Sequence, residues 1–300
     1  MAKNVAASVH QKLLNKAKNE KRPFNELLQY FVIERFLYRL SHSQHAERFV
    51  LKGALLFRVW TIQDSRATRD IDFLAYGDNS LENLTSVAKN VMLIEAKDGL
   101  VFDTESVRAQ RIKEDADYEG TRIVCDVYLG KAVSRLQLDI AFGDVVHPEP
   151  TKNKYPTILG HPAPILHLYP PETVFAEKLQ AMIHLGAMNS RMKDFYDLWC
   201  FREQHTFDSE LLIDSVRKTL SNRDTEAIGF SDIQGELNEA GDKQRQWVAF
   251  LSKSDLSAPM EFREILELLE QIVSPVLDAV ANESEFAADW IPGESWKQRS

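Results

Sequence analysis

Two aspartates that stand two residues apart, Asp70 and Asp72, have the spacing that most directly suggests chemistry. Residues i and i+2 of a β-strand point to the same face, so the two carboxylates would lie side by side, with Ile71 and Phe73 facing the core. Carboxylates this close repel each other unless a cation or solvent compensates. Mg²⁺ is often held by one or two carboxylates together with substrate phosphates. Taken alone, the pair also fits an ordinary exposed acidic strand.

A glycine turn precedes the aspartate pair. The apolar run 49–51 predicts a strand, Lys52 and Gly53 follow it, and residues 54–60 have a helical pattern. A glycine at the start of a helix lets backbone N–H groups approach a phosphate, and the helix dipole favours that anion. Gly53 alone could equally be a plain turn glycine. The order strand, glycine turn, helix and acidic strand is more informative than any one part.

A third carboxylate, Asp139, lies in the alternating segment 136–142. If this segment pairs beside the first acidic strand, three carboxylates could hold two metal ions that clamp the attacking and leaving oxygens of an in-line displacement. Asp126 and Asp144 are rivals for this third position, and a solvated aspartate at a strand end is the alternative for Asp139.

Further charged residues follow in the second half. Lys178 lies in a helical segment, where it could reach a phosphate or pair with Asp194. Asp194 and Asp197 are one helical turn apart and share a helix face. The ordinary alternatives are a surface lysine for Lys178, and solvated helix charges or an N-cap for the two aspartates.

The elements that must position these residues follow from periodicity. Apolar residues recur at helical spacing in residues 5–18 and 27–40. The middle of the chain alternates apolar and polar residues, as half-buried strands do, and includes a helical stretch at 84–90. These patterns predict strands at residues 49–51, 70–75, 122–128 and 136–142.

Prolines cluster between residues 148 and 171 and predict extended or turn structure there. Helical periodicity then returns, and the polar tail after residue 282 is expected to fray. The predicted helices are residues 174–185, 191–203, 209–220 and 259–280. The plan is therefore an α+β protein with an N-terminal helical segment packed on the core (1–48), an α/β domain (49–168) and a C-terminal helical domain (169–300).

Composition limits the class of protein. With 300 residues, 44% hydrophobic and 27% charged, the chain can bury a sizeable core. Cys125 and Cys200 are far apart, which argues against a disulfide framework or zinc site and favours a reducing compartment. We expect a cytoplasmic protein, because no signal peptide or membrane span is visible. The net charge of −9 argues against a general nucleic-acid coat but allows a local basic patch that binds RNA.

The motifs together resemble those of the AbiEii/AbiGii toxin family of nucleotidyltransferases, the toxin half of type IV toxin–antitoxin and abortive-infection systems. The resemblance runs from Val5 to about Cys200. Its motifs are Arg48-Phe49-Val50-Leu51-Lys52-Gly53, the "R-x-T-x-D-x-D" residues Arg66, Thr68, Asp70 and Asp72, the "K-L-x-A" helix Lys178-Leu179-Gln180-Ala181, and the "D-x-x-D-L" residues Asp194, Asp197 and Leu198.

The resemblance implies a polymerase-β-like nucleotidyltransferase fold with a small mixed sheet, a bound nucleoside triphosphate and Mg²⁺. It implies that Asp70, Asp72 and Asp139 hold metal, and that Lys178 neutralises phosphate charge while Asp194 acts near the attacking group or orients that lysine. The nucleotide would contact the backbone or side chains of Lys52, Gly53, Arg66, Thr68 and Lys178. One departure stands out: Ala54 follows Gly53 where the family often has a hydroxyl side chain, which puts nucleotide affinity and choice in question.

The function expected from the resemblance is a toxin that transfers a nucleotide from an NTP to an acceptor. The favoured acceptor is RNA, such as the 3′ end of tRNA, and a cognate antitoxin is the expected partner. Two alternatives stay open: a nucleotide-binding regulator without transferase activity, motivated by Gly53-Ala54, and a helical interaction protein whose acidic pairs are only surface charge.

Overall fold

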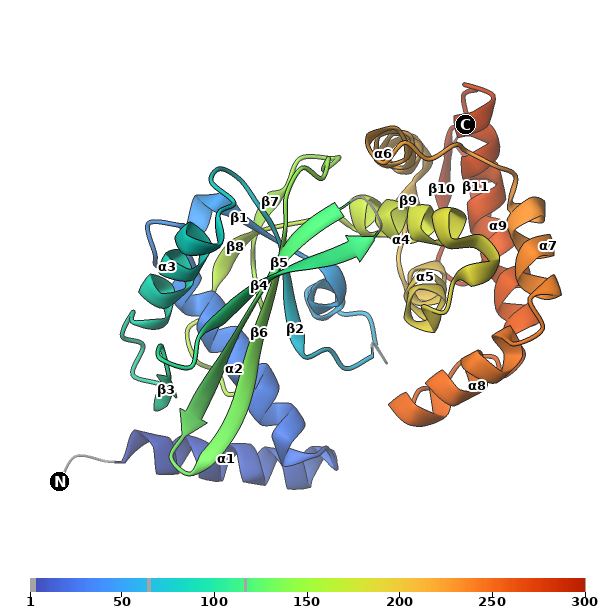
Figure 1. Cartoon of the computed structure of the whole chain (residues 1–300). Helices are drawn as coiled ribbons and strands as arrows, with labels where there is room; N and C mark the ends of the chain where they lie inside the picture. The colour runs from blue at the N-terminus through green and yellow to red at the C-terminus, as the bar shows by residue number, and fades with distance from the viewer. Residues whose placement is uncertain (1–3, 64–65, 116–117, 300) are drawn as a thin grey trace. The chain divides into compact units, whose positions relative to one another are not determined.

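The computed structural model describes residues 4–63, 66–115 and 118–299 (Figure 1). Compactness divides the chain into two units, which are described separately below. Unit 1 contains residues 1–59, 67–143 and 151–168, and unit 2 contains residues 60–66, 144–150 and 169–300. The predicted division at residues 48 and 168 stays a prediction. The compact units place the N-terminal helices with the sheet and assign two short earlier segments to unit 2.

A mixed sheet forms the centre of unit 1. Within the described residues it has eight strands in the order β3-β5-β6-β2-β1-β8-β7, with β4 also pairing with β5. The central strand β2 is antiparallel to β1 and parallel to β6. The strands are β1 (Phe49–Lys52), β2 (Asp70–Ala75), β3 (Leu100–Phe102), β4 (Arg108–Asp115), β5 (Tyr118–Leu129), β6 (Ala132–Ala141), β7 (Thr151–Lys154) and β8 (Ile165–Leu168).

Three helices accompany the sheet: α1 (Val5–Glu20), α2 (Phe24–Ser41) and α3 (Leu81–Met92). Figure 1 shows α2 running along the sheet beside β6, with α3 next to it. Ile71 and Phe73 of β2 and Leu138 of β6 are at most 2% exposed and contribute to the core beneath these helices. The alternation of β2 therefore places one apolar face on the helices and leaves Asp70 and Asp72 on the other face.

Helix α2 also buries charged side chains. Arg35 and Arg39 both donate to the carboxylate of Asp98, at 3.1 Å and 2.6 Å, in a site where all three side chains are at most 4% exposed. Glu34 accepts a 2.7 Å hydrogen bond from the backbone N–H of Ile158 through Oε2. Its Oε1 has no hydrogen-bond partner within the described part of the chain. Burial raises the pKa of the Glu34 carboxyl to about 7.

Unit 2 is largely helical. It contains α4 (Pro171–Leu185), α5 (Met192–Gln204), α6 (Ser209–Asn222), α7 (Phe230–Glu239), α8 (Lys243–Ser254) and α9 (Phe262–Ala281). Helix α4 packs against α5 and α6, and α9 packs against α5, α6, α7 and α8. Strands β9 (Phe207–Asp208), β10 (Ala288–Trp290) and β11 (Trp296–Gln298) form a separate small sheet. No helix among the described residues is long and apolar enough to cross a membrane.

The predicted α+β class is confirmed, as are the two N-terminal helices, the four main strands, the helix at 84–90 and the four C-terminal helices. The α-helix expected at residues 54–60 is wrong. The structure has the short 3₁₀ helix η2 (Gly53–Arg58) there. Positive φ angles at Gly53 (76°) and Thr61 (56°) bound the segment, and Ala54 to Phe57 are all buried, so it has no polar face. It is too short for the helix-dipole phosphate site that we expected.

The fraying expected for the tail after residue 282 is also wrong. Strand β10 pairs with β9 and with β11. Trp290 is fully buried, and its indole N–H donates a hydrogen bond of ordinary length, 2.9 Å, to the carbonyl of Arg202. An aromatic anchor with a satisfied N–H therefore holds this segment in place.

Candidate active site

Asp70 and Asp72 lie on one face of β2, both partly exposed, while Ile71 and Phe73 are buried. The register places Asp72 between Lys52 of β1 and Asp139 of β6, and places Asp70 beside Gln137 of β6. Directly opposite residues on neighbouring strands project from the same face. The sheet therefore brings the three predicted carboxylates together, as the sequence analysis expected for Asp139.

Gly53 lies directly against this acidic group. Its φ is +76°, and a Cβ added there would lie 3.0 Å from Cγ of Asp72, 3.1 Å from its Cβ and closer still to Oδ2. Only glycine fits this position without moving the carboxylate. The glycine that begins η2 therefore leaves room for the Asp72 carboxylate.

Asp139 has a second neighbour that the sequence analysis missed. Arg122 of β5 donates two hydrogen bonds of 2.8 Å, one to each oxygen of the Asp139 carboxylate. Gln137 adds a longer one of 3.2 Å to Oδ2. The Asp139 carboxylate raises the pKa of the Arg122 guanidinium, and Asp70 and Asp72 add to this effect. Arg122 is therefore an internal counter-charge for the acidic group.

This counter-charge bears on metal binding. Within the described residues, no three His, Cys, Asp or Glu side chains come together as a ready metal-binding group. Asp70 and Asp72 supply hard oxygen donors on one face, whereas both oxygens of Asp139 already accept from Arg122. The role of Asp139 as a third metal ligand stays a prediction, and it requires Arg122 to release the carboxylate.

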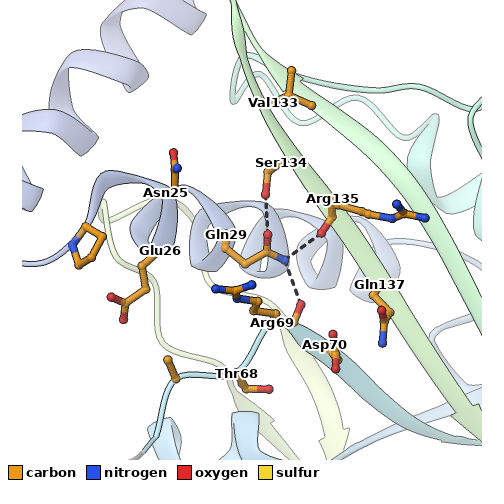
Figure 2. A pocket seen from close by; sticks show the side chains of 12 residues that line it. Asn25, Glu26, Gln29, Thr68, Arg69, Asp70, Val133, Ser134, Arg135 and Gln137 are labelled. Atoms are coloured by element: carbon orange, nitrogen blue, oxygen red, sulfur yellow. Dashed lines mark hydrogen bonds between the residues drawn. The ribbon is translucent and has the colours of Figure 1, made fainter. Parts of the chain in front are cut away.

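The side chain of Gln29 on α2 ties together the chain segments around Asp70. Its Nε2 donates to the carbonyls of Arg69 (2.9 Å) and Arg135 (3.1 Å), and its Oε1 accepts from Ser134 at 2.5 Å. Figure 2 shows these three contacts meeting at one amide group. The next residue, Tyr30, accepts a 3.3 Å hydrogen bond from the backbone N–H of Thr68 through its hydroxyl. Helix α2 thus fixes the residues that lead into the acidic strand.

A groove opens beside Asp70. It has a volume of about 570 Å³, which is within the range of small-molecule sites. Its walls come from the N-terminal end of α2, from the residues before β2 and from β6, and Thr68, Arg69, Asp70, Arg135 and Gln137 line it (Figure 2). The predicted nucleotide-contacting residue Thr68 therefore faces a space large enough for part of a nucleotide.

In unit 2, the predicted residues Lys178, Asp194 and Arg66 form one charged network with Asp197. The Lys178 Nζ lies 3.0 Å from Asp194 Oδ1 and 2.6 Å from Asp197 Oδ2. Arg66 donates to both oxygens of Asp197, with its Nη2 at 3.1 Å. The Lys178 side chain is 11% exposed and those of the two aspartates 8% and 3%. The alternatives of a surface lysine, solvated helix charges and an N-cap are therefore wrong here. The N-cap position of α5 is Arg191.

Burial and pairing oppose each other in this network. Burial alone would lower the pKa of the Lys178 ammonium, but the carboxylates of Asp194 and Asp197 outweigh it and raise that pKa above its usual value. Burial would likewise raise the pKa of the Asp197 carboxyl, yet Lys178 and Arg66 hold it below its usual value. Pairing therefore favours the charged forms of Lys178 and Asp197 in spite of their burial. Asp194 therefore pairs with Lys178, and the two roles expected for it, near the attacking group or in orienting that lysine, stay predictions.

The rival third carboxylates have different surroundings. Asp126 of β5 faces Arg135 in the register, away from Asp72 along the strands. Asp144 belongs to unit 2, where it pairs with Arg223 at 3.0 Å and is 3% exposed. Asp139 is therefore the carboxylate that the sheet places beside Asp72. The predicted contacts of Lys52, Gly53, Arg66, Thr68 and Lys178 with a nucleotide stay predictions.

The mixed sheet of this α+β chain thus presents paired aspartates beside a glycine turn. The family described as the nucleotidyl transferase AbiEii toxin of type IV toxin–antitoxin systems matches residues 35–268. The chain belongs to this family, and nucleotidyl transfer is the activity of the family. No curated protein matches the chain.

Two solved structures are similar to the chain. One is a candidate nucleotidyltransferase from H. pylori, at 16% identity and a TM-score of 0.44, with 92% of this chain and 97% of that chain covered. The other is JHP933 from Helicobacter pylori, at 15% identity and a TM-score of 0.41, with 83% and 88% covered.

Proposed function

We propose that the protein transfers a nucleotide from an NTP to a hydroxyl of an RNA acceptor, such as the 3′ end of tRNA, in a reaction that depends on Mg²⁺. The observation that carries this proposal is the row of Asp72 and Asp139 on adjacent parallel strands, with Asp70 two residues away on the same face and Gly53 packed against Asp72. The family membership supports the transfer step, and the acceptor and the metal are our additions.

The donor set fits Mg²⁺. Asp70 and Asp72 offer carboxylate oxygens on one strand face, and Mg²⁺ is usually bound through one or two carboxylates plus substrate phosphates. When bound, the ion would neutralise phosphate charge and align the reacting oxygens. Asp70 and Asp72 would hold the ion, and Asp139 would join them if its hydrogen bonds with Arg122 broke.

In the transfer, one bond to the α-phosphorus forms and one bond to it breaks. The acceptor hydroxyl oxygen bonds to the α-phosphorus, the bond from that phosphorus to the bridging oxygen of the β-phosphate breaks, and pyrophosphate leaves. The hydroxyl proton passes to a carboxylate or to solvent. Positioning and charge neutralisation supply most of the catalysis in such displacements. The ammonium of Lys178, aimed by Asp194, is suited to phosphate charge.

The test is label transfer by the purified protein. It is incubated with total cellular RNA, Mg²⁺ and each of the four α-labelled NTPs in turn. We expect label in RNA with at least one NTP, lost on adding EDTA and in the Asp72→Asn variant. Asp255→Asn is the matched control, because Asp255 is exposed with a left-handed backbone that asparagine accepts. RNA that stays unlabelled with a folded protein, or labelling that survives Asp72→Asn, would overturn the proposal.

The family also supports an antitoxin partner, which we propose is encoded next to this chain. Binding of an NTP without label transfer would instead favour the nucleotide-binding regulator.

A further inference from the structure

A second hollow lies beside the groove at Asp70, on the same face of the sheet. The second hollow has a volume of about 310 Å³ and lies over β4, β5 and β6. Arg135 and Gln137 line both hollows. Arg108 of β4 sits at the far side, in the register row that runs through Val124 and Gln137 to Asp70. The two hollows therefore adjoin at Arg135 and Gln137, and we treat them as one path with Asp70 at one end.

This path is lined by exposed arginines, and one of them, Arg135, lies opposite Asp126 in the register of β5 with β6. Arg69 and Arg135 are exposed, and their guanidinium groups have no ion-pair partner among the described residues. Glu26, the one acidic wall residue of the groove other than Asp70, is paired with Arg22 at 2.5 Å. In a chain of net charge −9, exposed arginines gathered around two adjoining hollows mark a local anion site, although Arg108 already donates through Nη1 to the carbonyls of Glu105 and Val107.

The length of the path indicates a polymer of phosphates. Arg108 on β4 and Arg135 on β6 lie two strands apart and two residues apart along the strands, so their backbones are separated by roughly 12 Å. The groove at Arg69 extends the path further, to the other side of Arg135. One triphosphate is a compact group, whereas charges repeated along an open path suit the backbone of a nucleic-acid strand.

The floor of the path is held rigidly. The backbone carbonyls of Arg69 and Arg135 both accept from Gln29, so these two residues have fixed main chains and outward side chains (Figure 2). The fixed main chains hold the Cα atoms of Arg69 and Arg135 in two different segments of the groove wall. Because the backbone at these two arginines is already ordered, binding of a phosphate does not have to pay the entropy of ordering it.

We propose that the adjoining hollows bind the single-stranded 3′ segment of the RNA acceptor, with its phosphodiester groups on Arg69, Arg135 and Arg108 and its terminal hydroxyl directed to the Asp70 end. This inference rests on the proposed function for its choice of RNA. It adds which surface of unit 1 holds the acceptor and which side chains contact it.

The experiment measures binding separately from turnover. A 12-nucleotide single-stranded RNA of mixed sequence, labelled with fluorescein at its 5′ end, is titrated with the full-length protein at several salt concentrations. Fluorescence anisotropy is compared for wild type, Arg135→Gln, Arg69→Gln and the control Lys12→Gln. Lys12 is an exposed cation on α1 in the same unit, so the control makes the same change in charge. The affinity for a fluorescent ATP analogue is measured in parallel.

We expect Arg135→Gln to weaken RNA binding about tenfold and to reduce the slope of log affinity against log salt by about 0.7, the value for one phosphate contact on a single strand. Arg69→Gln should behave alike, while Lys12→Gln and the ATP affinity stay unchanged. Equal RNA affinity in Arg135→Gln and Lys12→Gln would overturn the inference. Loss of ATP binding with unchanged RNA binding would overturn it as well, since the path would then hold the triphosphate.

The two proposals fail separately. If RNA binds along this path but receives no label from any NTP, the transferase proposal fails and the binding site stands. If RNA is labelled while both arginine variants bind and react like wild type, the acceptor lies elsewhere and only this inference fails. A duplex RNA of the same length that competes as well as the single strand would contradict the single-stranded preference.

Discussion

Replacing Gly53 by alanine is expected to reduce activity far more than stability. The added Cβ would lie 3.0 Å from Cγ of Asp72 and nearer to Oδ2, so the carboxylate must leave its present position relative to Asp70 and Asp139. A misplacement of about 1 Å in a reacting group can cost roughly 100-fold in rate. We therefore expect nucleotidyl transfer to fall by about that factor.

The stability cost has a separate origin. The φ of Gly53 is +76°, and a non-glycine residue in the left-handed region costs about 1–2 kcal/mol. Gly160 provides the matched control, because its φ is +71° and no heavy atom lies within 4 Å of an added Cβ. Gly160→Ala should therefore show the backbone cost without the collision at Asp72.

The assay pairs label transfer with thermal unfolding of the two variants. Each kcal/mol is expected to shift the Tm by about 2–4 °C in a domain of 150 to 250 residues. Both variants should lose similar stability, while Gly53→Ala alone loses activity. The reasoning is refuted if Gly53→Ala transfers nucleotides as fast as Gly160→Ala, since Asp72 would then have room to spare.

Three further outcomes follow from the polar side chains of Lys178, Glu34 and Gln29. Lys178→Met should destabilise the protein by roughly 3 kcal/mol, because it leaves the Asp194 carboxylate buried without its cation. Denaturant titration measures this loss of stability. The double variant that also carries Asp194→Asn should recover part of it. Glu34 has a pKa of about 7 in the folded protein against an unfolded 4.5, so its protonation favours the folded state. That stability is fully present below about pH 4.5 and is lost as pH rises through 7, at about 1.4 kcal/mol per pH unit. Glu34→Gln should remove this slope, and an unchanged pH profile would contradict the assignment. Gln29→Leu should cost about 1 kcal/mol in a denaturant titration, and kcat should fall further than that loss predicts, since Asp70 is no longer held from α2.

The parts of the fold that follow from local periodicity could be predicted from the sequence. Strand β2 has the predicted bounds because Asp70 and Asp72 alternate with Ile71 and Phe73 and a short apolar run follows. Strand β7 could not be predicted, because all four of its residues are exposed and polar, and only pairing with β8 makes it a strand. The buried Trp290 of β10 gave no periodic signal in a polar tail, although its isolated large aromatic ring was a hint.

The features of the candidate site also fall into those that local sequence predicts and those that depend on the whole sheet. Asp70 and Asp72 share a face through local geometry, which the sequence contains. The fork of Arg122 on Asp139 depends on the register of β5 with β6, and that register is set by the whole sheet. The basic residue at an alternating position of a predicted strand was the available signal. The hydrogen bonds of Gln29 had no such signal, because a polar residue on an apolar helix is ordinarily a surface residue.

The interleaving of the two units along the chain has a consequence for how this protein can be divided. Residues 60–66 and 144–150 belong to unit 2 but lie between pieces of unit 1. A single cut, at residue 168 for example, gives no independent halves: a fragment that begins at Tyr169 lacks Arg66 and leaves Asp197 without its guanidinium. Gene fusion at one junction could therefore neither add nor exchange the helical unit intact, and the two units must be inherited, expressed and tested as one piece.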